Sequence, residues 1–278
     1  MRWTGGRGSS NIEDRRGMGG GMAMGGGALG ILGLLAYLFL GVDITGGGAG
    51  GAPQEQVPAS EAPANDAQAQ FVGQVLRDTE VAWGSIFEQQ VHQPYQEPTL
   101  VLFEQSVRSA CGMAGSAVGP FYCPGDRKVY IDLSFYDELR SRFGAPGDFA
   151  QAYVIAHEVG HHVQNLLGTS REVERAMRGS SETEANRYSV MQELQADCYA
   201  GIWAKNRQPG TFEIDDSDID EALTAAAAIG DDRLQEQAQG YVVPESFTHG
   251  SSAQRQRWFR EGFRTGDLRA CDTFSRGV

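Results

Sequence analysis

The sequence predicts an α+β fold, mostly helical with a small sheet, after one N-terminal transmembrane helix. Three observations lead to this prediction. Residues 28–44 form one apolar stretch, residues 99–107 and 128–136 are rich in β-branched and aromatic side chains, and the rest is mostly helical in pattern. Because the strands come before most of the helices instead of alternating with them, a doubly wound parallel sheet is not expected.

The composition is typical of a globular protein and excludes one class of partner. The chain has 278 residues, of which 41% are hydrophobic and 21% are charged. Its net charge of -13 argues against nucleic-acid binding, which requires a basic face. We therefore expect no nucleic-acid partner.

Residues 1–27 are predicted to be a short cytoplasmic arm, and residues 28–44 a transmembrane anchor. The anchor reaches the ~20 residues that a bilayer requires only if part of the preceding Gly/Met-rich run is included. Arginines precede it, and the next basic residue is Arg77, so the positive-inside rule predicts a single-pass protein with its N-terminus in the cytoplasm. A cleaved signal peptide remains the alternative.

The Gly/Pro/Ala-rich residues 45–70 are predicted to be a flexible linker, because they contain hardly any large apolar side chain. One folded domain is then expected over residues 71–278, on the extracytoplasmic side of the membrane. Its four cysteines would then lie in an oxidising location, where disulfides are expected. Proximity suggests a bridge between Cys111 and Cys123, which leaves Cys198 to pair with Cys271. The other pairings, and free buried thiols, remain open.

Within the domain, apolar spacing predicts a helix over 71–91, and Pro or Gly residues bound the two predicted strands, 99–107 and 128–136. Further helices are predicted over 149–167, 182–206, 216–229 and 252–262. Asp148 with Gln151, and Ser181 with Glu184, have the spacing of capping boxes, and Gly168 is expected to end the helix that contains residues 149–167.

That helix contains the sequence His157-Glu158-Val159-Gly160-His161. Residues four apart share a helix face, so His157 and His161 can bind one metal ion while Glu158 lies beside it. With 5 histidines in 278 residues, about 0.006 chance matches to H-E-x-x-H are expected. Two surface histidines on a polar stripe are the alternative.

A catalytic zinc takes three protein ligands, so one more is required. Glu193 and Asp197 lie one turn apart on a second predicted helix, with small residues nearby that favour close helix packing. We expect Glu193 as the third ligand of one Zn²⁺ and Asp197 as the hydrogen-bond acceptor for a ligating histidine. A solvated acidic stripe is the alternative.

Two further histidines are not expected to bind the metal. The side chain of His162 is rotated by ~100° from that of His161, which predicts a supporting or packing role. His92 has no histidine or acidic neighbour at ligand spacing and is interpreted as a surface residue.

The chain resembles the bacterial "putative neutral zinc metallopeptidase" family, which is membrane-anchored. The resemblance covers nearly the whole chain, and it is carried by the Arg-containing start, the Gly-rich apolar segment, and four motifs. These motifs are CGMAGSAVGPFYCPGDRKVYIDLSF, AHEVGHHVQ, ELQADCYAGIWA and THGSSAQRQRWFREGF. More distantly, the Glu-x-x-x-Asp pair is similar to that of thermolysin-like and CAAX-processing zinc proteases. The resemblance implies a zincin-like peptidase domain, with Glu193 as ligand and Asp197 supporting a histidine.

The predicted function is therefore a membrane-anchored zinc endopeptidase that acts on a protein or peptide substrate. A zinc-bound water would attack the peptide bond, and Glu158 would act as the general base. The strand 128–136 could offer an edge to an extended peptide. The alternatives are a zinc amidase or deformylase acting on a non-protein amide, and a non-catalytic, zinc-stabilised envelope interaction module. The physiological substrate and the oligomeric state cannot be derived from the sequence.

His249 is the last predicted catalytic residue. Attack of water on an amide creates an oxyanion that needs a positioned donor. His249 precedes the helix 252–262, where Arg255 or Arg257 could help to orient a substrate. A loop histidine packed on Trp258 or Phe247 is the alternative.

Overall fold

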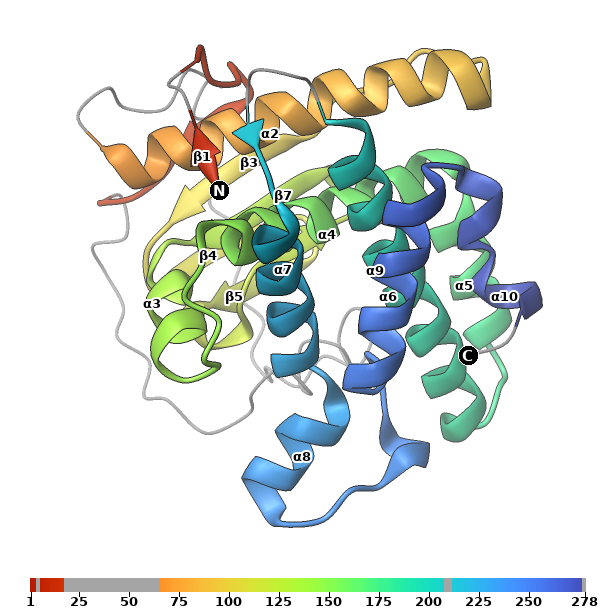
Figure 1. The fold of residues 1–278 in the computed structure, drawn as a ribbon. Helices are drawn as coiled ribbons and strands as arrows, with labels where there is room; N and C mark the ends of the chain where they lie inside the picture. The colour runs from red at the N-terminus through yellow and green to blue at the C-terminus, as the bar shows by residue number, and fades with distance from the viewer. Residues whose placement is uncertain (4–5, 18–65, 208–211, 277–278) are drawn as a thin grey trace, which may run out of the picture.

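The computed structural model describes residues 1–3, 6–17, 66–207 and 212–276. A four-stranded sheet with the order β2-β3-β7-β6 lies beside the central helices (Figure 1). Its strands are β2 (Ile12–Asp14), β3 (Thr99–Phe103), β7 (Lys128–Asp132) and β6 (Phe121–Cys123). β2, β3 and β7 are parallel, whereas β6 pairs antiparallel with β7 and forms one edge of the sheet.

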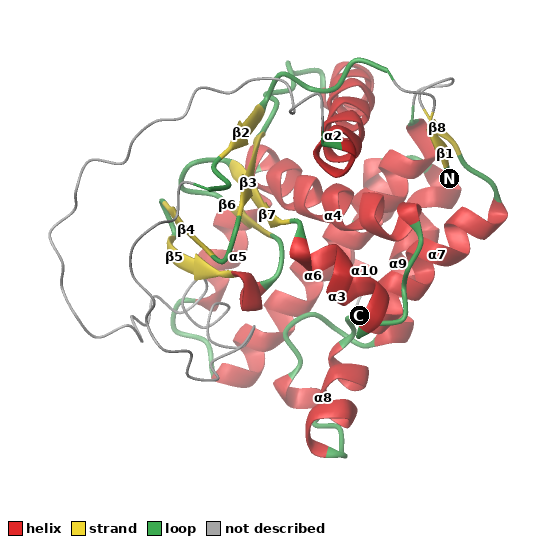
Figure 2. Cartoon of the chain, turned by 90° about the vertical axis from the view of Figure 1, so that its left-hand side faces the viewer, coloured by secondary structure: helices red, strands yellow, loops and turns green. Residues whose placement is uncertain are grey.

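Different elements bury the two faces of this sheet. Along β3, Leu100 and Leu102 belong to the main helical core, whereas Val101 and Phe103 belong to a second cluster on the opposite face. The hairpin of β4 (Ser106–Ser109) and β5 (Gly112–Gly115) contributes to that second cluster. Figure 2 shows the sheet and hairpin on one side of the molecule and most helices on the other.

Long helices form most of the core. They are α2 (Ala67–Ile86), α4 (Asp148–Leu167), α6 (Glu182–Asn206), α7 (Asp216–Ala228) and α9 (Ser252–Thr265). Large aromatic side chains fill the space between them, and the rings of Phe149 and Trp203 stack with their centroids 5.7 Å apart. The backbones of α6 and α9 lie so close at their crossing that a Cβ atom on Gly201 would lie 2.0 Å from the carbonyl oxygen of Phe259.

The remaining elements are short. They are β1 (Arg2–Trp3), β8 (Phe212–Glu213), α3 (Ser134–Ser141), α5 (Thr169–Met177), α8 (Asp231–Gln239), α10 (Thr273–Arg276), a π-helical turn (Phe87–Val91), and the 3-10 turns Ser116–Val118, Pro244–Ser246 and Leu268–Cys271.

Several element boundaries differ from the prediction. The run 99–107 divides into β3 and β4. The run 128–136 ends as a strand at Asp132, because its carboxylate accepts the backbone N–H of Ser134 at 2.9 Å and α3 begins there. Asp148 is the first residue of α4 and not its cap; instead, the carboxylate of Glu221 on α7 accepts the backbone N–H of Phe149 at 3.1 Å. Gly168 ends α4 as predicted, with φ 89°.

The described N-terminal residues, 1–3 and 6–17, pack against the rest of the domain, whereas the sequence predicts a separate arm over residues 1–27. β2 pairs with β3, Ile12 is fully buried opposite Leu100, and the backbone N–H of Ser9 donates to the carbonyl of Gly73 at 2.8 Å. A single crossing by residues 28–44 would place the two strands on opposite sides of a membrane. The predicted cytoplasmic arm is therefore incompatible with this sheet.

The predicted anchor, residues 28–44, and most of the linker 45–70 lie outside the described residues. Within the described part of the chain, no helix combines the length and apolarity needed to cross a bilayer. The last residues of the predicted linker are helical, because the carboxylate of Asp66 accepts the backbone N–H groups of Gln68 and Ala69 at the start of α2. The folded domain thus resumes before Phe71.

The disulfide suggested by proximity and the one left by elimination are both present. Cys111 bonds to Cys123 and joins the β4–β5 hairpin to β6. Cys198 bonds to Cys271 and ties α6 to the C-terminal segment. Among the described residues no cysteine is free.

Candidate metal centre

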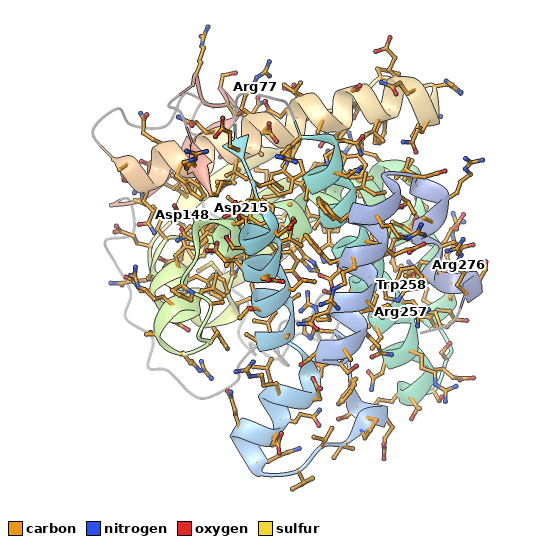
Figure 3. The ribbon with its side chains drawn as sticks, in the orientation of Figure 1. Arg77, Asp148, Asp215, Arg257, Trp258 and Arg276 are labelled. Atoms are coloured by element: carbon orange, nitrogen blue, oxygen red, sulfur yellow. A yellow bond between two sulfur atoms is a disulfide. The ribbon has the colours of Figure 1, made fainter. Side chains whose placement is uncertain are left out.

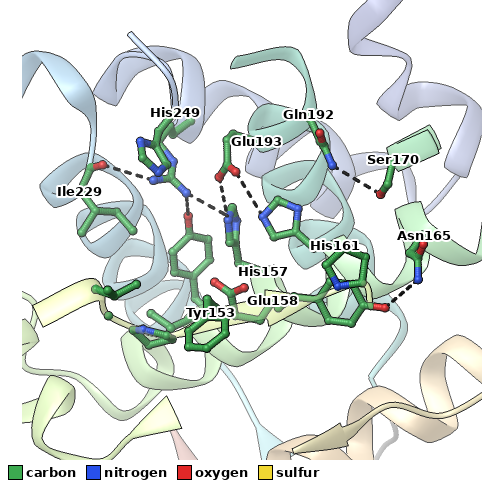
Figure 4. Close-up of a pocket in the computed structure, with 18 of the residues that line it drawn as sticks. Tyr153, His157, Glu158, His161, Asn165, Ser170, Gln192, Glu193, Ile229 and His249 are labelled. Atoms are coloured by element: carbon green, nitrogen blue, oxygen red, sulfur yellow. Dashed lines mark hydrogen bonds and ion pairs between the residues drawn. The ribbon is translucent and has the colours of Figure 1, made fainter. Parts of the chain in front are cut away.

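The histidines of α4 and a carboxylate of α6 converge at one point. Nε2 of His157 lies 3.1 Å from one carboxylate oxygen of Glu193, and Nε2 of His161 lies 3.4 Å from the other. One potential ligand atom from each of the three residues falls within 4.8 Å of the others. Figure 4 shows both imidazoles directed toward the Glu193 carboxylate.

A glycine inside the motif allows this convergence. A Cβ atom on Gly160 would lie 2.9 Å from the carbonyl oxygen of Ala196 and 3.1 Å from its Cα. The backbones of α4 and α6 therefore touch between the histidines and the carboxylate, which agrees with the close packing expected from Ala196 and its small neighbours. This contact brings Glu193 within reach of both imidazoles.

The donor set fits zinc. Two imidazole nitrogens and one carboxylate oxygen are a known ligand set of catalytic zinc, which leaves a further coordination position open. Glu158 lies next to this group, lines the same cleft and is 7% exposed. Burial raises the pKa of the Glu158 carboxyl, although His157 and His161 act in the opposite direction.

A buried ion pair supports His157. The Nδ1–H of His157 donates to Asp197 at 2.9 Å, and Asp197 also accepts two hydrogen bonds from Arg255, at 2.8 and 3.0 Å. The hydroxyl of Tyr153 donates to the same carboxylate at 2.5 Å. Burial opposes ionisation of Asp197, but Arg255 and His157 lower its pKa to about 2. Asp197 is therefore a fixed carboxylate, as the sequence predicts.

The electrostatics of His157 favour binding of a cation. Burial lowers the pKa of its imidazole, but Asp197 and Glu193 outweigh burial and raise it to about 10. A metal ion that binds at Nε2 must displace a proton there. The surrounding carboxylates thus attract either a proton or a metal ion to the same point.

His161 has a different partner. Its Nδ1 lies 2.9 Å from the side-chain oxygen of Gln164, which is fully buried between α4 and α6. Neither Gln164 nor Tyr153 is singled out by a sequence motif.

His249 lines the same cleft and is held by Asp231. The Asp231 carboxylate accepts the Nδ1–H of His249 at 3.2 Å and its backbone N–H at 2.6 Å. Burial lowers the pKa of His249, but Asp231 and then Glu193 raise it above its usual value. Asp231 begins α8, and no local sequence pattern predicts this role for it.

The other predicted supporting residues have separate positions. Arg255 contacts Asp197, whereas the guanidinium of Arg257 lies over the ring of Trp258, 5.5 Å from its centroid. Arg257 and Trp258 are neighbours on α9 (Figure 3). His162 is fully buried and lies 3.0 Å from the hydroxyl of Tyr122, so it packs behind the site. His92 is exposed.

A cleft of about 330 Å³ contains the candidate site. Its walls come from the segment that leads into β6 and from α3, α4, α5, α6, α8 and α9. The lining residues include Val118, Gly119, Pro120, Phe121, Tyr122, Phe135, Phe143, Val154, Asn165, Ser170, Arg171, Gln192, Ile229 and Leu234. β7 is an interior strand, so the predicted edge at 128–136 is wrong, and β6 is the edge strand that borders the cleft.

Comparisons with known proteins found one family model and several relatives. The family model described as "Putative neutral zinc metallopeptidase" matches residues 1–274. The "Uncharacterized protein YpfJ" of Escherichia coli (strain K12) is 49% identical over 290 residues, which cover 100% of both chains. The "Uncharacterized protein Rv2575" of Mycobacterium tuberculosis (strain ATCC 25618 / H37Rv) is 48% identical over 191 residues, covering 65% of this chain and 64% of the relative. No solved structure matches the chain.

Proposed function

Because this chain belongs to the family described as "Putative neutral zinc metallopeptidase", we propose that it is a membrane-associated, zinc-dependent endopeptidase with a zincin-like catalytic domain. The observation that carries the proposal is the convergence of His157, His161 and Glu193 within 4.8 Å, with Glu158 beside them in a cleft. A solvated acidic stripe does not explain this convergence, because Glu193 and Asp197 are buried at 4% and 0% exposure.

Each of these residues has a separate role in the proposed hydrolysis. A zinc ion bound by His157, His161 and Glu193 would activate water and polarise the substrate carbonyl. Glu158 takes a proton from the attacking water and transfers it to the leaving amine. Its burial supports this role, because a carboxyl with a raised pKa is a better base. Asp197 keeps the Nε2 atom of His157 directed at the metal position.

His249 completes the proposed machinery. The Nδ1–H of His249 donates to Asp231, and the raised pKa of the ring favours the imidazolium, whose Nε2–H can donate to an oxyanion. An extended peptide would add to the edge of β6, which borders the cleft. The substrate class that fits is therefore an unfolded protein segment or a peptide.

We place the catalytic domain on the extracytoplasmic side of a bacterial membrane. Two disulfides support this location, because such bonds persist in oxidising compartments. The association with the membrane would come from the apolar sequence 28–44.

Substitution of the proposed base tests the function. Purified full-length protein should bind about one zinc and cleave unfolded protein substrates. Glu158→Gln should keep the zinc and lose cleavage, because the base is not a ligand. Glu193→Ala should lose both. Zinc content would be measured by mass spectrometry and cleavage by peptide mapping.

The outcomes separate the alternatives. Zinc binding without hydrolysis by the wild type would favour a non-catalytic interaction module. Hydrolysis of small N-acyl amides but not of peptides would favour an amidase or deformylase. Normal zinc binding by Glu193→Ala would show that the third ligand lies elsewhere.

A further inference from the structure

We infer that Gln164 is a positioning residue for the metal, because its side-chain oxygen accepts the Nδ1–H of His161 and so leaves Nε2 free to bind. The inference rests on the proposed metal site. His157 and His161 both direct Nε2 toward Glu193, and both direct Nδ1 away from it. At His157 the partner of Nδ1 is the carboxylate of Asp197, and at His161 it is the amide of Gln164, at 2.9 Å.

The hydrogen bonds of Gln164 determine which end of its amide faces His161. The amide nitrogen donates to the backbone carbonyl of Gln192 at 2.7 Å. A carbonyl can only accept, so the nitrogen must face Gln192 and the oxygen must face His161. The amide oxygen can also only accept, so Nδ1 of His161 must carry the hydrogen. The lone pair of a neutral imidazole is then on Nε2, the atom that faces Glu193.

A second hydrogen bond strengthens this assignment. The amide nitrogen of Gln164 also donates to the side-chain oxygen of Gln195 at 3.1 Å, and the amide of Gln195 donates to the carbonyl of Cys271 at 3.0 Å. In this series of hydrogen bonds, the amide nitrogens of Gln164 and Gln195 each donate to an oxygen that can accept. Gln164 is 0% exposed, so a turned amide would leave buried groups unsatisfied, which is costly.

The neutral partner suits the charge of the site. Glu158, Glu193 and Asp197 already place three buried carboxyl groups around the two histidines. A further carboxylate at position 164 would add repulsion and a desolvation cost. An amide orients the ring without adding charge.

Gln164 acts through His161 and not on a substrate. It lies three residues after His161, in the interface between α4 and α6, and it is not among the residues that line the cleft. A substitution there should change metal affinity without removing a substrate contact.

The test compares two buried glutamines. Gln164→Met removes the amide but keeps a similar volume. The control is Gln74→Met, because Gln74 is also buried in a helix and donates to a backbone carbonyl, that of Gly6, away from the cleft. The zinc dissociation constant of each full-length variant would be measured by chelator competition. Nitrogen-15 NMR of labelled histidines would report the Nδ1–H of His161 with and without zinc.

We expect Gln164→Met to weaken zinc binding by about 10- to 100-fold, as changes in the partners of ligands commonly do, and to lose the protected Nδ1–H signal of His161. Gln74→Met should match the wild type in both. Gln164→Glu keeps an acceptor for Nδ1 and should recover part of the zinc affinity, but it loses the donations to Gln192 and Gln195 and should be less stable. If both variants fold poorly, the tautomer of His161 in the wild-type protein still tests the inference.

Two results would overturn the inference. One is a zinc affinity and an Nδ1–H signal in Gln164→Met that match those of Gln74→Met. The other is an Nε2–H tautomer of His161 in the wild-type protein. Absence of zinc binding by the wild type would instead count against the proposed function, and the metal-free NMR comparison would still test the role of Gln164.

Discussion

His249 is the proposed oxyanion donor, and its contribution can be measured separately from metal binding. It lines the cleft but is held by Asp231 and not by the histidines of α4. His249→Ala should retain zinc and the fold while kcat falls by roughly 10²- to 10³-fold, the usual cost of one lost oxyanion donor. Steady-state kinetics with metal analysis would check this. Unchanged kcat would show that His249 is structural, and loss of zinc would show that it is a ligand.

Asp197 and Arg255 form a buried ion pair, and we expect it to contribute to stability. Arg255 is 1% exposed, so Asp197→Asn would leave its charge without a counterion. We expect a loss of about 3–5 kcal/mol in the free energy of unfolding. Asp197→Asn/Arg255→Met should recover much of that stability but not the zinc affinity, because His157 still lacks its carboxylate.

Denaturant unfolding and chelator competition would give both quantities. If the loss in the free energy of unfolding of the double variant equals the sum of the losses of Asp197→Asn and Arg255→Met, the two residues do not act as a pair. A double variant with normal zinc affinity would instead show that Asp197 does not support His157.

The burial of His162 predicts a pH effect. Burial lowers its pKa from 6.5 to about 4, even though the carbonyl of Gln96 accepts from its Nε2–H. Between these values the unfolded chain binds more protons than the folded chain, so the free energy of unfolding decreases as the pH falls from 6.5 toward 4. The contribution is at most about 3 kcal/mol. Denaturant unfolding at several pH values would check this. Between pH 6.5 and 4, the free energy of unfolding should fall more steeply with decreasing pH for the wild type than for His162→Gln.

Local spacing predicts the candidate metal ligands but not the residues that support them. His157, His161 and Glu193 follow from helix periodicity and from the chemistry of zinc ligands. Arg255 lies 58 residues from Asp197, so its pairing depends on how α9 packs, which one sequence does not reveal. Gln164 is near His161, but its amide has no distinguishing pattern.

At the scale of elements, the crossing of α6 and α9 depends on two glycines. A Cβ atom on Gly201 would lie 2.0 Å from the carbonyl of Phe259, and one on Gly262 would lie 1.9 Å from the carbonyl of Cys198. Gly201→Ala should therefore force the helices apart and move Asp197 away from Arg255. We expect a loss of stability of at least about 1–3 kcal/mol, as in other overpacked cores.

Gly84 provides the matched control. It lies in α2, and a Cβ atom there meets nothing within 4 Å. Gly84→Ala should leave stability unchanged or raise it by about 0.5–1 kcal/mol, because alanine is the better helix former. The midpoints of thermal unfolding would be compared. Equal midpoints for Gly201→Ala and Gly84→Ala would contradict the role assigned to Gly201.

The boundaries of the elements show what patterning misses. The run 128–136 has strand-like residues throughout, but the side chain of Asp132, in the strand itself, accepts the backbone N–H of Ser134 at the start of α3. The run 99–107 is interrupted at Gln105, which has φ 63° and leads into β4. Such turns depend on single hydrogen bonds and backbone angles, which residue type alone predicts poorly.

At the scale of the whole molecule, the sheet constrains the membrane topology. β2 and β3 are neighbours in one sheet, so residues 6–17 and the rest of the folded domain should lie on the same side of a membrane. A cysteine introduced at exposed Ser10 should react with a membrane-impermeant thiol reagent in intact cells. A cysteine at exposed Gln237 in α8 should react equally.

Labelling of Ser10→Cys that appears only after the inner membrane is permeabilised, while Gln237→Cys reacts in intact cells, would contradict this topology. The sequence predicted the opposite arrangement because the positive-inside rule counts charges. The rule takes no account of tertiary contacts, such as the burial of Ile12 in the sheet and the ion pairs of Arg15 and Arg16 with acidic residues of the same domain.

The ion pair between Arg16 and Asp66, at 2.5 Å, joins the two ends of the stretch 18–65. Together with the pairing of β2 to β3, this leads us to expect that β2 stays in place without covalent continuity through that stretch. Proteolysis between these residues would produce a nicked protein whose N-terminal fragment stays bound through backbone pairing with β3 and through contacts such as that of Ser9 with Gly73. The two fragments would separate under denaturing conditions, and a synthetic peptide of residues 6–17 would compete for the vacant edge of β3.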